Sequence, residues 1–239
     1  MTRDAWEDEK FAGEWDFAGS VETNPDRHHQ VGLVARLLME NCPPGSCLLD
    51  LGIGSGQVEA CLHEMAPTFF ASRSLLGIDA SDAMLTLAES RFSSLGLDSR
   101  IRLQRTDFGD LDGLPVGETF DAVLCIQALH EVADPVKQAV FRWTLSRLNA
   151  GGVFYIADRF TYRYTPFFPD LRVIWDAMRD TLADPGAVPD FGSYHERYSA
   201  KKDHVAALRD YEEWLRAAGF EVAVLYQQFN RALLAARKA

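Results

Sequence analysis

The chain has 239 residues, 47% of them hydrophobic and 25% charged, so it can bury a sizeable core and is neither disordered nor collagen-like. Its net charge of −11 at pH 7 repels phosphate backbones and anionic lipid headgroups, which argues against nucleic-acid and membrane-surface partners. No apolar run approaches the roughly 20 residues of a membrane helix, and the first ten residues do not resemble a signal peptide, so we expect a soluble cytoplasmic protein.

Residues 1–26 combine eight acidic and two basic side chains with Trp6, Phe11, Trp15 and Phe17. A disordered acidic tail would not need those aromatic rings. We therefore expect residues 1–26 to form a cover segment that packs against the main domain, which would span residues 27–239.

Short apolar runs then alternate with helical periodicity. A helix is expected over 27–41, ended by Pro43-Pro44-Gly45, and strands are expected at 47–51, 75–79, 101–105, 120–126 and 152–158. The helices between them would span 57–65, begin at Ser81, and begin at Asp134 as N-cap with Pro135 in the first helical position. Such alternation predicts a parallel sheet with both faces covered.

Beyond residue 158 the alternation lapses over an aromatic, proline-bearing stretch. We expect residues 159–204 to be a functional insert that forms an aromatic, helical lid over the crevice. An amphipathic helix ended by Gly219 follows, and then two strand-like runs around Gln227-Gln228. A connection of two residues predicts an antiparallel hairpin at the end of the fold.

The four cysteines point to no special chemistry. Cys42, Cys47, Cys61 and Cys125 include no CxxC pair and no histidine cluster at zinc-ligand spacing. We interpret them as reduced structural residues and predict no metal site.

A glycine-rich turn follows the first strand of the alternating region. Gly52 permits a tight turn, Gly54 lets a ligand approach the backbone, and Gly56 allows close helix packing. Because Gln57 follows Gly56, the spacing is GxGxG rather than the dinucleotide fingerprint, and the lysine of a phosphate-binding loop is absent. The turn is expected to face the crevice at the carboxyl ends of the strands.

Two carboxylates follow the next two strands. Asp79 lies 23 residues after Gly56, where a carboxylate can accept hydrogen bonds from both ribose hydroxyls. Asp107, beside Phe108, suits the amino group and ring of an adenine. Each feature alone also fits a simple turn or helix cap, but three in register with successive strands predict a nucleoside site.

From Arg27 to the C-terminus these residues resemble the class I S-adenosylmethionine-dependent methyltransferases. The resemblance implies a doubly wound, Rossmann-like α/β fold, with a seven-stranded sheet that is mostly parallel and has a reversed last strand. It implies S-adenosylmethionine as cofactor and methyl transfer as activity. Its first motif would hold the methionine part of the cofactor, through Asp50, Gly52, Ile53, Gly54 and Gly56. The resemblance also implies that Asp79 binds the ribose and that Ala80 and Met84 line the adenosine. The adenine would contact Asp107 and Phe108, and the sulfonium would lie beside Ile126 and Gln127.

In-line methyl transfer gains most from alignment and exclusion of water, and a base is needed only when the acceptor arrives protonated. The candidate bases are His130, just past the fourth strand, and His195 and His204 in the expected lid. A structural or surface role is the alternative for each. The aromatic residues favour a small, partly apolar acceptor methylated at oxygen or nitrogen, and a homodimer is left open.

Two other functions fit the same pattern. The C-terminal layout, from 152–160 and from Trp214 to Phe220, is similar to the carboxy-S-adenosylmethionine synthase branch, which serves modification of a transfer-RNA wobble uridine. That branch holds the added carboxylate with an arginine, whereas this sequence has His204 at the position obtained by counting back from Gly219. A cofactor-binding module without turnover is the other alternative.

Overall fold

The computed structural model describes residues 8–18, 25–114, 117–161, 165–179, 191, 204–228 and 230–238. Seven strands form one sheet, namely β1 (Cys47–Leu51), β2 (Ser74–Asp79), β3 (Ile101–Arg105), β4 (Phe120–Ile126), β5 (Leu148–Arg159), β6 (Glu221–Gln228) and β7 (Arg231–Arg237). The α-helices with bounds in the described part are α2 (Glu9–Ala18), α3 (Pro25–Asn41), α4 (Gln57–Met65), α5 (Asp82–Leu95), α6 (Asp134–Arg147), α7 (Phe168–Arg179) and α9 (Leu208–Ala218).

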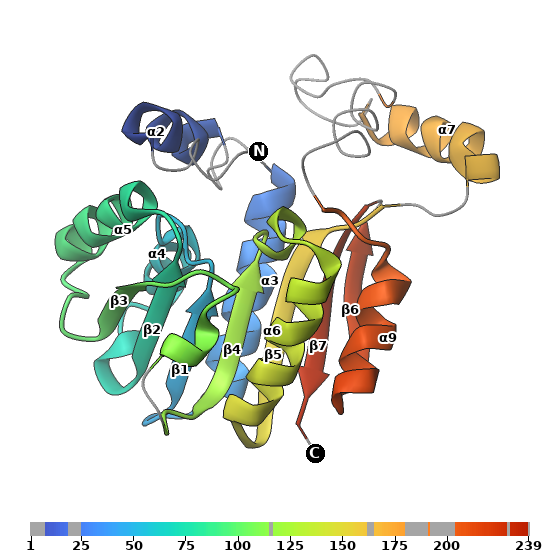
Figure 1. Cartoon of the computed structure of the whole chain (residues 1–239). Coiled ribbons are helices and arrows are strands. Elements are labelled where there is room, and N and C mark those ends of the chain that lie inside the picture. The colour runs from blue at the N-terminus through green and yellow to red at the C-terminus, as the bar shows by residue number, and fades with distance from the viewer. Residues whose placement is uncertain are drawn as a thin grey trace.

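The sheet has the strand order β3-β2-β1-β4-β5-β7-β6. Strands β1 to β5 are parallel, and β7 runs antiparallel to both β5 and β6 (Figure 1). The predicted seven-stranded sheet with a reversed last strand is therefore confirmed. The order changes direction between β1 and β4, which is where open α/β sheets bind their ligands.

The core lies on both faces of the sheet, as continuous apolar strands require. Leu48 packs with residues of α3 and α4 on one face, while its neighbour Leu49 packs with residues of α6 and α9 on the other. This alternation follows from the two-residue period of a strand. The central strands are thus rigid supports for the loops at their carboxyl ends.

Several predicted boundaries are exact, and others shift. The helix over 57–65 is confirmed as α4, and the Ser81 hydroxyl caps α5 by accepting from the Met84 N–H at 3.1 Å. At α6 the N-cap is Ala133, so Asp134 and Pro135 are already the first two helical residues. Strand β6 continues through Gln227-Gln228 because both residues pair with β7, so the predicted connection at these two residues is part of the strand.

The described part of the stretch over 159–204 contains the end of a strand and a helix. Strand β5 extends to Arg159, and α7 follows from Phe168. Trp175 of α7 is buried and its ring centroid lies 6.1 Å from that of Phe191. Most of the rest of this stretch lies outside the described residues, so a lid over 159–204 stays a prediction. Within the part of the chain that the structure describes, no helix has both the length and the apolarity to cross a membrane.

Candidate active site

The glycine loop between β1 and α4 needs its glycines. Gly52, Gly54 and Gly56 all have left-handed backbone, with φ of +78°, +56° and +74°. A Cβ on Gly52 would lie 2.5 Å from Cβ of Ala128, and one on Gly56 would lie 2.6 Å from Cε1 of Phe92. Side chains at these positions would be strained by conformation and by space, so the loop follows the path that the GxGxG spacing predicts.

Asp79, at the end of β2, ties this loop to the next turn. Its Oδ2 accepts from the Gly54 N–H and its Oδ1 accepts from the Ser81 N–H, both at 2.9 Å. The N–H groups of Gly52 and Ile53 donate to the carbonyl of Ile78 at 2.8 and 2.9 Å. Asp79 therefore lies directly at the glycine loop, and its expected contact with a ribose stays a prediction.

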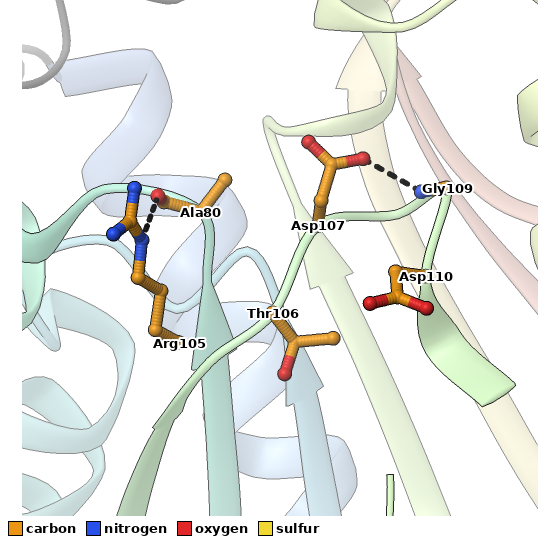
Figure 2. A pocket seen from close by; sticks show the side chains of 6 residues that line it. All are labelled: Ala80, Arg105, Thr106, Asp107, Gly109 and Asp110. Carbon is orange, nitrogen blue, oxygen red and sulfur yellow. Dashed lines mark hydrogen bonds between the residues drawn. The ribbon is translucent and has the colours of Figure 1, made fainter. Parts of the chain in front are cut away.

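A pocket of about 510 Å³ opens beside the ends of β2 and β3. Figure 2 shows its lining, which is Ala80, Arg105, Thr106, Asp107, Gly109 and Asp110. The Arg105 Nε–H donates to the Ala80 carbonyl at 3.1 Å, and Asp107 accepts from the Gly109 N–H at 2.7 Å. Two residues expected at an adenosine, Ala80 and Asp107, thus line one pocket. A carboxylate, a backbone turn and adequate volume at this edge fit an adenosyl group.

The other expected cofactor residues surround the loop. Met84 is buried in α5, and a Cβ on Gly54 would lie 3.5 Å from its Cε. The Phe108 ring lies against Gly52, since a Cβ there would be 3.3 Å from its Cζ. Gln127 has a φ of +57°, an uncommon conformation for a residue other than glycine, and its N–H donates to the Ala157 carbonyl at 2.7 Å. Ile126 is buried at the end of β4.

A second carboxyl group, which sequence reasoning missed, lies beside Asp50. Glu59 of α4 and Asp50 of β1 are each 1% exposed. Burial, and then the neighbouring Asp50 carboxylate, raise the pKa of Glu59 well above its usual value. Glu59 comes three residues after Gly56, in the first turn of the expected helix. This position in the sequence could have predicted that Glu59 lies near the glycine loop.

His130 joins the ends of β4 and β5. It lies in a short 3-10 turn after β4, and its side chain is 3% exposed. Its Nδ1 lies 2.5 Å from Oδ1 of Asp158, which also accepts from the Tyr211 hydroxyl at 3.2 Å through Oδ2. Its Nε2 contacts the Arg159 guanidinium and lies 3.3 Å from Oε1 of Glu131. The structure thus pairs Asp158 with His130.

Burial and charge set the protonation of this pair. Burial lowers the pKa of His130, but the Asp158 carboxylate outweighs it, so the net pKa is raised. Burial raises the pKa of Asp158, and the opposing effect of His130 leaves that pKa lowered. A buried imidazole held by a carboxylate has the geometry of an oriented general base.

The other two histidine candidates are placed differently. The His204 side chain is exposed, and it is the backbone N–H of His204 that donates to the His130 carbonyl at 2.6 Å. The His204 carbonyl accepts from the buried Lys137 ammonium. The structure therefore brings the His204 backbone to the site. His195 and the side chains of Trp15 and Phe17 lie outside the described residues.

The mixed sheet, the glycine loop after β1 and the carboxylates after β2 and β3 define a class I methyltransferase fold. Comparisons with known proteins agree. Residues 48–152 match the model of a family described as a methyltransferase domain. The chain is 28% identical over 200 residues to the ubiquinone biosynthesis O-methyltransferase of Xanthomonas axonopodis pv. citri, covering 82% of this chain and 73% of that one.

Two solved structures share the fold. The magnesium protoporphyrin IX methyltransferase of Synechocystis PCC 6803, with bound SAH, has a TM-score of 0.66 at 18% identity and covers 99% of this chain and 98% of its own. A proposed O-methyltransferase from Nostoc punctiforme PCC 73102 has a TM-score of 0.61 at 19% identity and covers 88% of this chain, which spans 56% of that structure. The protein is a class I S-adenosylmethionine-dependent methyltransferase.

Proposed function

We propose that the protein methylates a hydroxyl oxygen of a small-molecule acceptor, with His130 as general base. The observation that carries the proposal is the 2.5 Å contact between His130 and Asp158 at the carboxyl ends of β4 and β5. The similarity to an O-methyltransferase of ubiquinone biosynthesis over 82% of the chain supports oxygen as the acceptor atom. S-adenosylmethionine supplies an electrophilic methyl group, and the residues at the ends of β1, β2 and β3 would hold it.

A hydroxyl acceptor arrives protonated, so the site needs a group that removes its proton. The Asp158 carboxylate favours the tautomer with hydrogen on Nδ1 of His130, which leaves the Nε2 lone pair as the proton acceptor. The acceptor hydroxyl would take the place of the Arg159 guanidinium at Nε2. Once Nε2 is protonated, Glu131 Oε1 lies within reach to accept its hydrogen.

The test compares His130→Asn with the wild type. We expect kcat for a phenol or catechol to fall by about 10²–10⁴-fold, while binding of S-adenosylhomocysteine by calorimetry is unchanged. His204→Asn is the matched control, because that imidazole is exposed and should leave both quantities unchanged. Wild-type kcat in His130→Asn would contradict the assignment.

The pH profile gives an independent readout. His130 must be neutral to accept a proton, and the net effect of its neighbours is to raise its pKa above 6.5. The rate of phenol methylation should therefore rise with pH along a limb whose apparent pKa lies above 6.5, and this limb should be absent in His130→Asn.

The remaining expectations on partners stay predictions. The acidic net charge favours a small molecule over nucleic acid, and both the homodimer and the cytoplasmic location are untested. Mass spectrometry of the ligand that copurifies with the protein separates the plain cofactor from its carboxylated form. If the carboxylated form is found, the carboxy-S-adenosylmethionine synthase alternative replaces the methyltransferase proposal.

A further inference from the structure

Helix α2 belongs to the expected N-terminal cover segment and lies beside the cofactor loop. Helix α2 lies near α5 (Figure 1). Its buried Ala12 packs against Ala83 and Met84 in the first turn of α5. Met84 is also the α5 side chain that faces Gly54. Helix α2 therefore contacts the residues that border the glycine loop.

One carboxylate joins α2 to two other elements. Asp16 accepts from the Ser55 hydroxyl within the glycine loop and, through Oδ1, from Nε2 of Gln57 at 2.6 Å. Its Oδ2 lies 3.0 Å from Nη2 of Arg91 on α5. Arg91 in turn donates to the Ser55 carbonyl, so Asp16, Ser55 and Arg91 close a ring of contacts. We term these three residues and Gln57 the Asp16 cluster.

The electrostatics of the Asp16 cluster favour the ionised carboxylate. The N-cap of α4 is Gly56, which has no side chain to cap the helix, and Asp16 places a negative charge at that end. Burial opposes ionisation, but hydrogen bonds from Ser55 and Gln57 and the charge of Arg91 leave the pKa of Asp16 lowered. The Asp16 side chain is 20% exposed and that of Arg91 is 26% exposed, so water screens the pair only in part.

We propose that Asp16 is a positioning residue that fastens α2 against the glycine loop and thereby sets how fast the cofactor leaves. Ser55 lies between Gly54 and Gly56, so a contact to Ser55 restrains the same loop that approaches the ligand. A cofactor held at the glycine loop would leave faster when the contacts of Asp16 to the loop and to α5 are broken. Segments that close over a ligand in this way limit its release and exclude water. The proposal does not depend on which acceptor is methylated.

The test measures release of S-adenosylhomocysteine from the full chain. Protein loaded with radiolabelled S-adenosylhomocysteine is diluted into excess unlabelled compound, and bound label is followed on filters. We expect Asp16→Ala to release the label about tenfold faster than wild type and Asp16→Asn to be intermediate, because the amide keeps one acceptor oxygen but loses the other and the charge opposite Arg91. Glu14→Gln is the matched control, since Glu14 is on the same helix but 68% exposed, and should release at the wild-type rate.

Melting of the ligand-free variants separates positioning from folding. The proposal requires that release accelerates while the ligand-free melting temperature of Asp16→Asn stays near that of wild type. It is overturned if both Asp16 variants release the label at the wild-type rate, if Glu14→Gln accelerates release equally, or if faster release appears only in proportion to lost melting temperature. If Asp16→Ala does not fold, the release rate and the melting temperature of Asp16→Asn decide the test.

Discussion

Gly56 and Gly96 offer a matched pair of residues with left-handed backbone. Their φ values are +74° and +69°, but a Cβ on Gly56 would lie 2.6 Å from Cε1 of Phe92, while nothing lies within 4 Å of one on Gly96. Gly96→Ala should therefore cost only the conformational penalty of about 1–2 kcal/mol. Gly56→Ala should cost a further 1–3 kcal/mol, approximately, for overpacking against a buried ring.

Urea unfolding of both variants measures this difference in the free energy of unfolding. Equal costs for the two substitutions would show that Phe92 moves aside freely, and the close packing of α5 on the glycine loop would then not constrain position 56.

Single site residues could be predicted from the sequence where their spacing from a strand indicates their position. Gly52, Gly54, Gly56 and Asp79 came from their positions after strands, and the structure places them at one loop. Asp16 was visible only as one of eight acids, because its partner Arg91 is 75 residues away. Likewise Asp158 lies 28 residues from His130. Such pairings depend on the tertiary arrangement, which local patterns do not encode.

Helix α6 is tied to the chain entering α9 by one buried ammonium group. Lys137 is fully buried, and it donates to the His204 carbonyl and to Oδ1 of Asp134 at 2.7 Å. Lys137→Met keeps most of the volume but leaves the His204 carbonyl without this donor. We expect the free energy of unfolding to fall by about 1–3 kcal/mol.

Asp134→Asn is the control, because its side chain is 50% exposed and an exposed ion pair contributes about 0–1 kcal/mol. Chemical denaturation of both variants provides the measurement. If Asp134→Asn loses as much stability as Lys137→Met, the ion pair with Asp134, and not the hydrogen bond to the His204 carbonyl, is the contact of Lys137 that stabilises the fold.

The helices whose bounds depend on local sequence patterns were predicted best. The pattern of α4 and the Ser81 cap of α5 are local, and both agree with the structure. The end of β6 was misplaced because its pairing with β7, not its turn residues, sets its length. At α6, proline is compatible with either of the first two helical positions, so the sequence could not choose between Ala133 and Asp134 as N-cap.

For the whole molecule, cofactor binding should appear as thermal stabilisation. S-adenosylmethionine at 100 times its dissociation constant adds about 2.7 kcal/mol, which for a chain of this size raises the melting temperature by roughly 5–10 °C. Asp79→Ala should abolish this shift, because the carboxylate lies at the glycine loop.

The comparison uses the shift with ligand rather than the melting temperature itself, since Asp79 also accepts from two backbone N–H groups. Glu89→Gln serves as control, because Glu89 is exposed on the next helix, α5. If the ligand raises the melting temperature of Asp79→Ala as much as that of the wild type, Asp79 does not bind the cofactor.

The position of β7 between β5 and β6 has a consequence for synthesis on the ribosome. During translation β6 emerges before β7, yet it has no partner until β7 is inserted beside β5. The β5 residues Asp158 and Arg159 pair with Ala232 and Arg231 in that same step. A nascent chain shorter than about residue 237 would therefore leave both strands with unpaired edges, exposed to chaperones and to aggregation.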